Sequence, residues 1–166
     1  MKKKCSLLIL STLLFTSCVN YNENVSNKYE GKTPYLNVSK VENIDLTSIS
    51  SQKYIELFNN GTTFICLLGT DGCSACKASK EHYLLPYIEQ TKNEIYYLDV
   101  YDDFNRPYLS AIKDLQPSES DYIYYNSNNE LVVKRPLLQI ISNREVIVYE
   151  MGVSKNLTYM LESYIL

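Results

Sequence analysis

The chain has 166 residues, of which 45 % are hydrophobic and 21 % are charged, a composition typical of a globular protein with one main domain. Its net charge is −3, and this becomes −6 without the three lysines among the first four residues. An acidic chain of this kind lacks the basic surface that binding to nucleic acid requires. After residue 18, no segment is long and apolar enough to span a membrane.

The first 18 residues have the pattern of a secretory leader. Three lysines precede an apolar core of about nine residues that ends at Phe15, well below the ~20 residues that a membrane-spanning helix needs. The following Phe15-Thr-Ser-Cys18 resembles the bacterial lipoprotein box, in which the cysteine is lipidated and becomes the new N-terminus, although the box prefers Leu at the position of Phe15. We therefore expect a signal peptide over 1–17, a lipid on Cys18 and an extracytoplasmic location at the bacterial membrane. Ordinary cleavage or an uncleaved anchor is the alternative.

Residues 18–34 are polar and show little periodicity, so we interpret them as a flexible tether with a reach of roughly 20–25 Å. The folded domain is then expected over 35–166. Its first elements are a short strand within 35–46 and a helix that begins at Ser50 or Ser51 and ends near Asn59. The following Asn-Gly pair should stop that helix.

A Cys-x-x-Cys pair follows directly after the most apolar stretch of the chain. Thr62 to Leu68 is nearly continuous in apolar residues, as a strand covered on both faces requires, and a Gly/Asp turn separates it from Cys73 and Cys76. The next residues favour a helix from about Ser74 to Leu85, and Pro86 should then kink it or end a turn of it. A helix N-terminus favours a thiolate, the form that attacks disulfides. We therefore expect Cys73 to be the exposed nucleophile and Cys76 to be the resolving thiol.

This layout of strand, turn and Cys-x-x-Cys resembles the active site of the thioredoxin family. The resemblance implies an α/β fold with a mixed central sheet flanked by helices. It extends to the C-terminal third, where Pro136 is followed by a strand, a polar turn, a second strand and Gly152. In the family, that proline is cis and faces the cysteines, and the backbone of the preceding residue, here Arg135, pairs with the substrate chain. An ordinary trans proline at a strand edge is the alternative.

Between these two motifs we expect further elements at helical or strand spacing. They are a strand over Glu94–Val100, a helix over Pro107–Leu115, and a hairpin-like insertion at 116–131 built from Tyr122–Tyr125, an Asn-rich turn and Leu131–Val133. A last helix should begin after Ser154, which is suited to cap it.

The remaining cysteine and the only histidine have bland interpretations. Cys66 lies inside the apolar strand and is expected to be buried and inert. His82 follows Cys76 by six residues, and we interpret it as a solvated helix residue rather than a catalytic base. A zinc site formed by these two residues with the Cys-x-x-Cys pair is disfavoured because no second Cys-x-x-Cys exists, so we expect no metal.

Two departures from thioredoxin bear on the direction of electron flow. Its buried Asp, six residues before the first cysteine, is replaced by Leu67, and its buried Lys on the neighbouring strand is replaced by Tyr97. We expect Lys77 and Arg135 to lie near the sulfurs, where a positive charge stabilises a thiolate. A more stable thiolate makes the disulfide a better oxidant. The sequence itself leaves the direction open.

Together these features predict a membrane-tethered thiol–disulfide oxidoreductase that acts on the thiols or disulfides of exported proteins or peptides. Beyond the Cys73–Cys76 disulfide it needs no cofactor, and a membrane redox partner is possible. Phe64 to Cys76 and Ile95 to Asp99 resemble the bacteriocin transport accessory proteins of Gram-positive bacteria, which implies a small disulfide-bonded peptide as client. A reductase for cytochrome c maturation is another route. The alternative is a peptide-binding accessory or chaperone module whose cysteines do not turn over.

Overall fold

The computed structural model describes residues 44–164. The expected signal peptide, Cys18, the tether and most of the expected first strand therefore lie outside the described residues. Within 44–164, none of the helices has both the length and the apolar character needed to cross a membrane.

The described residues are built on one mixed five-stranded sheet in the order β1-β3-β2-β6-β7. β1, β3 and β2 run parallel, whereas β6 and β7 are antiparallel to their neighbours. Every residue of the central strand β2 is buried, as its apolar sequence predicts. The strands are β1 (Thr47–Ser48), β2 (Phe64–Gly69), β3 (Tyr96–Asp99), β6 (Leu137–Ser142) and β7 (Glu145–Met151).

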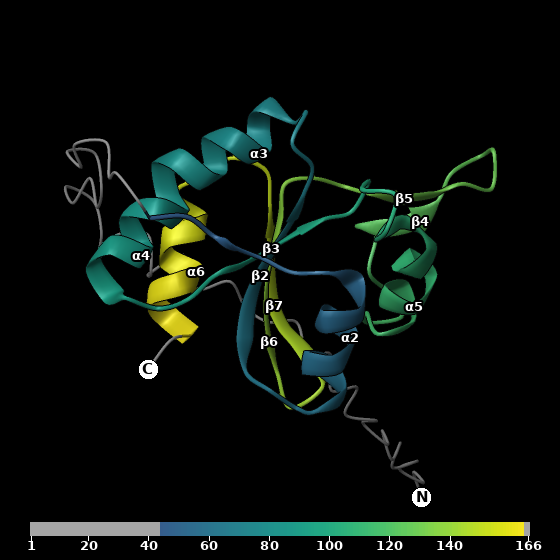
Figure 1. Cartoon of the computed structure of the whole chain (residues 1–166), viewed down its shortest axis with the longest axis horizontal. Coiled ribbons are helices and arrows are strands. Elements are labelled where there is room, and N and C mark those ends of the chain that lie inside the picture. Colours follow the sequence, from purple (N-terminus) through teal and green to yellow (C-terminus); the bar gives the residue numbers. More distant parts are fainter. Residues whose placement is uncertain (1–43, 165–166) are drawn as a thin grey trace, which may run out of the picture. The chain divides into compact units, whose positions relative to one another are not determined.

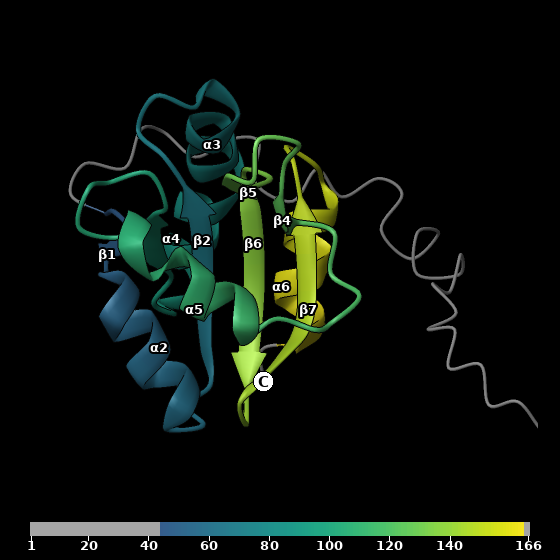
Figure 2. The ribbon, with the colours of Figure 1, turned by 90° about the vertical axis from the view of Figure 1, so that its right-hand side faces the viewer.

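Helices cover both faces of this sheet (Figures 1 and 2). On one face lie α2 (Ser51–Asn59) and α5 (Leu109–Asp114), the latter preceded by the 3-10 turn η2 (Arg106–Tyr108). On the other lie α3 (Ser74–Ser79), the π-helical turn η1 (Lys80–Leu84), α4 (Leu85–Thr91) and α6 (Asn156–Tyr164). Each face has its own apolar cluster, one centred on Tyr54 and Leu68 and the other on Leu67 and Leu84.

Helix α2 begins and ends where the sequence predicts. The Lys53 N–H donates to the Ser50 hydroxyl at 3.2 Å, which satisfies one of the free N–H groups of the first turn. Gly61, at a φ of +69°, then turns the chain away from the helix.

The expected strand within 35–46 lies mostly outside the described residues, and the described strand β1 follows it. Residues 44–46 are not in a strand, and β1 begins at Thr47. Two backbone hydrogen bonds pair β1 with β3. The Thr47 N–H donates to the Ile95 carbonyl at 3.0 Å, and the Ile49 N–H donates to the Tyr97 carbonyl at 2.9 Å.

The helix that carries the cysteines is longer than predicted. It was expected to end near Leu85, but α3, η1 and α4 continue to Thr91, past Pro86. A proline inside an α-helix lacks an N–H and clashes with the carbonyl four residues earlier. Here the wider π-helical turn precedes it, and the Leu85 N–H donates to the Lys80 carbonyl five residues back. The local widening accommodates the ring without ending the helix.

The predicted insertion is a separate two-stranded sheet made of β4 (Ile123–Tyr125) and β5 (Leu131–Val133). The buried side chains of Tyr122, Ile123 and Val133 join the apolar cluster on the α2/α5 face, and the hairpin lies beside α5 (Figure 1). This packing anchors a hairpin that would be marginally stable alone.

Candidate active site

Three strand ends meet at one edge of the sheet. In the register of the sheet Gly69, the last residue of β2, is paired with Asp99, the last residue of β3. On the other side Leu68 is paired with Leu137, the first residue of β6, which places Pro136 next to the end of β2. The turn that carries Cys73 continues directly from this edge, as the sequence predicts.

Cys73 and Cys76 form a disulfide across the first turn of α3, with their Cα atoms 5.2 Å apart. Their environments differ: Cys73 is half-buried, whereas Cys76 is only 4 % exposed. The Cys76 N–H donates to Cys73 Sγ at 3.1 Å. A backbone donor at a helix N-terminus is the kind of group that stabilises a thiolate at that sulfur. The arrangement gives Cys73 both the access and the electrostatic support that an attacking sulfur needs.

The Arg135–Pro136 peptide bond is cis, as the resemblance implied. Pro136 is buried, and its carbonyl accepts a hydrogen bond from the Gly152 N–H at 2.9 Å. The Gly152 carbonyl in turn accepts from the buried Ser79 hydroxyl of α3 at 3.3 Å. Ser79 thus links the cysteine-bearing helix to the strand end that holds the proline. Sequence reasoning missed this residue, since a serine in a helix gives no signal of its partner.

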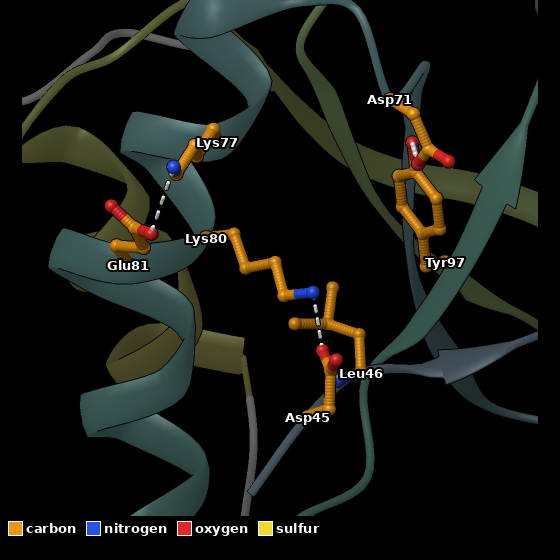
Figure 3. A network of polar contacts seen from close by, with 7 residues as sticks. All are labelled: Asp45, Leu46, Asp71, Lys77, Lys80, Glu81 and Tyr97. Carbon is orange, nitrogen blue, oxygen red and sulfur yellow. Dashed lines mark hydrogen bonds and ion pairs between the residues drawn. The ribbon is translucent and has the colours of Figure 1, made fainter. Parts of the chain in front are cut away.

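The two cations expected near the sulfurs have other partners. The Arg135 guanidinium lies over the Tyr101 ring, 4.4 Å from its centroid. Lys77 is well exposed and forms an ion pair with Glu81 at 3.8 Å on the outer side of the helix (Figure 3). The contacts of these two side chains are therefore with Tyr101 and Glu81, and they give no support for a thiolate.

Leu67 and Tyr97, the replacements for the thioredoxin Asp and Lys, are neighbours in the register of β2 and β3. Leu67 is fully buried and Tyr97 half-buried. Burial raises the pKa of Tyr97, and the nearby carboxylates of Asp99 and Asp71 raise it further, so this phenol keeps its proton. Its hydroxyl donates to Asp71 Oδ1 at 3.4 Å (Figure 3).

Asp99 holds the loops on both sides of the edge, a role that sequence reasoning missed. One carboxylate oxygen accepts from the Asp71 N–H (3.3 Å) and the Thr70 hydroxyl (3.4 Å), in the turn before the cysteines. The other oxygen accepts from the N–H groups of Tyr101 (2.9 Å) and Asp102 (3.2 Å). The sequence did contain a signal for this role: an Asp at the end of a strand, followed by a polar loop, commonly accepts hydrogen bonds from the backbone N–H groups of the turn.

Cys66 and His82 do not share the environment of the Cys73–Cys76 pair. Cys66 is free and fully buried in the cluster that contains Tyr54 and Phe64, and burial raises the pKa of its thiol far above the usual range. His82 is exposed on the π-helical turn. In the part of the chain that the structure describes, no group of three or more His, Cys, Asp or Glu side chains is arranged to hold a metal ion.

Comparisons with known proteins agree with this architecture. No protein-family model and no curated protein matches the chain. Among solved structures, thioredoxin f2 from Chlamydomonas reinhardtii matches with a TM-score of 0.53 and 10 % identity, covering 72 % of this chain and 96 % of the other. A thioredoxin mutant from Halobacterium salinarum NRC-1 matches with a TM-score of 0.49 and 19 % identity, covering 72 % and 90 %.

The class that these observations define is an α/β protein with a mixed sheet and a Cys-x-x-Cys disulfide at its edge. More particularly, the chain has the thioredoxin-like fold that its motifs predicted. At such low identity the likeness to solved structures concerns the fold alone. A Cys-x-x-Cys disulfide in this fold points to thiol–disulfide exchange.

Proposed function

We propose that this protein is a thiol–disulfide oxidoreductase that exchanges disulfides with exported proteins or peptides through Cys73 and Cys76. The observation that carries the proposal is the disulfide at the sheet edge between a half-buried cysteine, Cys73, and a buried one, Cys76. Exchange needs a sulfur that a client can reach and a second sulfur close enough to finish the reaction.

In the oxidising direction, a client thiolate attacks Cys73 Sγ, the Cys73–Cys76 bond breaks, and Cys76 leaves as a thiolate that takes up a proton. A second client thiolate then attacks the client sulfur of the mixed disulfide. The client leaves with its own disulfide, and both cysteines are reduced by the two electrons that the client has lost. In the reducing direction the same steps run backwards, with Cys73 as the attacking thiolate.

We propose the oxidising direction. The Cys76 N–H bonded to Cys73 Sγ stabilises the thiolate of the reduced form, and a stable thiolate makes a disulfide more oxidising. Leu67 and Tyr97 add support, because neither supplies a charged acid–base pair beneath the disulfide.

The reduction potential tests this direction. Thiol trapping in glutathione buffers should give a value of about −120 to −180 mV, the range of known oxidants and isomerases. A value near ~−270 mV, that of thioredoxin, would reverse the assigned direction. Cys73→Ser and Cys76→Ser variants show that the measured couple belongs to this pair. A pair that cannot be reduced without unfolding the protein would leave only peptide binding.

The clients and the location belong to the same proposal. The leader and Cys18 support export and lipid anchoring, and the resemblance to bacteriocin transport accessory proteins supports a small disulfide-bonded peptide as client. Repeated oxidation would also need a membrane redox partner to accept the two electrons. Mass spectrometry of the mature N-terminus, compared with a Cys18→Ser variant, tests the anchor. A Cys76→Ser variant should retain clients as mixed disulfides on Cys73, whereas a Cys73→Ser/Cys76→Ser variant should retain none.

A further inference from the structure

Gly69, the last residue of β2, leaves a space that two side chains share. A Cβ atom at this position would lie 3.2 Å from Cys76 Sγ and 3.1 Å from Cε2 of the Tyr97 ring. Both distances are too short for an unstrained contact, so a residue larger than glycine would displace one side chain or the other. The resolving sulfur and the edge of the Tyr97 ring therefore border the same small space above the strand.

The other end of Tyr97 reaches the loop that carries the nucleophile. Its hydroxyl donates to Asp71 Oδ1 at 3.4 Å, two residues before Cys73, and Figure 3 shows the ring standing under this carboxylate. A single side chain on β3 thus has its ring beside the same Gly69 position as the resolving sulfur, and its hydroxyl is bonded to the nucleophile's loop.

We propose that Tyr97 is a positioning residue that holds Cys76 in line with Cys73 for the resolving step. This inference rests on the exchange function proposed above. In that step the client is joined to Cys73 by a mixed disulfide, and the Cys76 thiolate attacks Cys73 Sγ. The bond between Cys73 and the client breaks, and the client sulfur leaves with the electron pair and takes up a proton. Two electrons pass from the cysteine pair to the client.

The rate and the equilibrium of this intramolecular step depend on how firmly the attacking sulfur is kept in the reactive geometry. On the proposed role, the ring limits the movement of Cys76 toward the sheet, because the ring edge and Cys76 Sγ both lie next to the Cβ position of Gly69. Sulfur also packs favourably at the edge of an aromatic ring. Removal of the ring opens this space, and the effective concentration of Cys76 at Cys73 falls.

Tyr96 provides a matched control on the same strand. It is also half-buried, but its ring packs against Phe64 on the opposite face of the sheet, with centroids 6.2 Å apart. Replacement of either tyrosine by alanine removes a similar side chain from β3. Only Tyr97 faces the disulfide, so a general loss of packing and a loss of positioning can be told apart.

The test is the equilibrium constant for forming the Cys73–Cys76 disulfide against glutathione. It is measured in the full-length chain by thiol trapping and mass spectrometry of the peptide that carries the pair. We expect Tyr97→Ala to lower the constant about tenfold, a rise of about 30 mV in the potential. Tyr97→Phe keeps the ring and should stay within about threefold of the wild type, and Tyr96→Ala should leave the constant unchanged. Tyr97→Ala should also prolong the mixed disulfide with glutathione.

Gly69→Ala tests the same space by adding a Cβ atom on β2. Its new Cβ would push against Cys76 Sγ, and we expect the constant to fall in the same direction even if Tyr97→Ala does not fold. The inference is overturned if folded Tyr97→Ala and Gly69→Ala stay within twofold of the wild type, or if Tyr96→Ala has an equal effect. A wild-type protein that reaches this equilibrium but reduces or oxidises no client would refute the proposed function alone.

Discussion

Two cysteines seven residues apart, Cys66 and Cys73, have sulfur environments that differ in almost every respect that governs reactivity. Cys73 lies at the open edge of the sheet, half-buried, with the Cys76 N–H directed at its sulfur. Cys66 lies in the middle of β2, fully buried and with no disulfide partner. Its partner in the sheet register, Gln139, belongs to a closed set of buried hydrogen bonds with Tyr54 and Gln116.

The difference shows that strand and turn positions, more than the presence of a thiol, decide which cysteine can react. The edge offers a donor to a negatively charged sulfur and access to a client. The interior offers polar groups that already bond one another: Gln139 accepts from the Tyr54 hydroxyl at 2.8 Å and donates to Gln116 at 2.7 Å. Nothing there compensates a thiolate for its lost hydration, and so burial raises the pKa of the Cys66 thiol.

The largest expected contrast is therefore in thiol chemistry. In the reduced native protein, iodoacetamide should modify Cys73 at least ~100-fold faster than Cys66, because the thiolate is the reacting species. Cys73→Ser should abolish exchange with a disulfide substrate, whereas Cys66→Ala should keep it. Mass spectrometry of the separate peptides after timed quenching gives the two rates in one sample.

Unfolding in urea provides the control for this contrast, since it should bring the two rates to within a few-fold of one another. Rapid modification of Cys66 in the native protein would contradict the picture of a closed interior. An exchange activity that survives Cys73→Ser would contradict the role of the edge.

The next contrast separates stability from redox chemistry. Gln139→Leu removes the acceptor of the Tyr54 O–H and the donor to the Gln116 carbonyl oxygen, and both of these buried groups lose that partner, although the Tyr54 oxygen still accepts from Gln116 Nε2 at 3.4 Å. We expect a loss of about 2–4 kcal/mol in the free energy of unfolding, since each buried unsatisfied group costs ~1–3 kcal/mol. The glutathione equilibrium of Cys73 and Cys76 should not change. Urea unfolding and thiol trapping on the same preparation measure both quantities.

Gln52→Leu is the matched control, because Gln52 is an exposed residue of α2. It should change the free energy of unfolding by no more than about 0.5 kcal/mol. A cost below about 1 kcal/mol for Gln139→Leu would mean that the interior network adapts to the change.

A smaller effect is expected at the edge itself. Asp99→Ala removes the carboxylate that accepts hydrogen bonds from Thr70 and Asp71, so the turn before Cys73 becomes less ordered. We expect a loss of about 1.5–3 kcal/mol in stability, typical of hydrogen bonds to a charged group. The exchange rate with dithiothreitol should change by a few-fold. Asp103→Ala, an exposed carboxylate on the neighbouring loop, should leave both quantities as they are. Equal effects of the two substitutions would refute a specific role for Asp99.

Much of this comparison could be predicted from the sequence. The apolar run before Cys73 predicted a buried central strand, and the position of Cys66 within it predicted a sealed thiol, because both follow from local patterns. The fold class and the cis bond before Pro136 followed from a resemblance between motifs. These features depend on a few residues next to one another in the chain.

The parts that sequence reasoning missed depend on contacts across the sheet. Tyr97 and Asp99 come from β3 and Ser79 comes from α3, and only the strand register and the Ser79–Gly152 hydrogen bond bring them to one edge. Lys77, which was expected near the sulfurs, forms an ion pair with Glu81, four residues on in the same helix. The four-residue spacing within a helix favours this pair, so here the sequence did carry the signal.

The smallest effect returns to Cys66 and concerns alkaline pH. Burial raises the pKa of this thiol in the folded protein above its ordinary value of 9.0. Below pH 9 both folded and unfolded chains hold the proton, so the thiol makes no pH-dependent contribution. Above it the unfolded chain loses the proton and the folded chain keeps it, and stability therefore falls as the pH rises.

For one such group we expect a loss of about 1.4 kcal/mol between pH 8 and pH 10, because pH 10 lies one unit above the unfolded pKa. Cys66→Ala should remove this part of the slope. The oxidised protein is used, with Cys5→Ser and Cys18→Ser in both samples, so that Cys66 is the only titrating thiol. Buried tyrosines such as Tyr54 titrate in both proteins and cancel in the difference. If stability depended on pH identically with and without Cys66→Ala, Cys66 would ionise in the folded state. Its thiol would then not be closed off from solvent, and the contrast with Cys73 would be wrong.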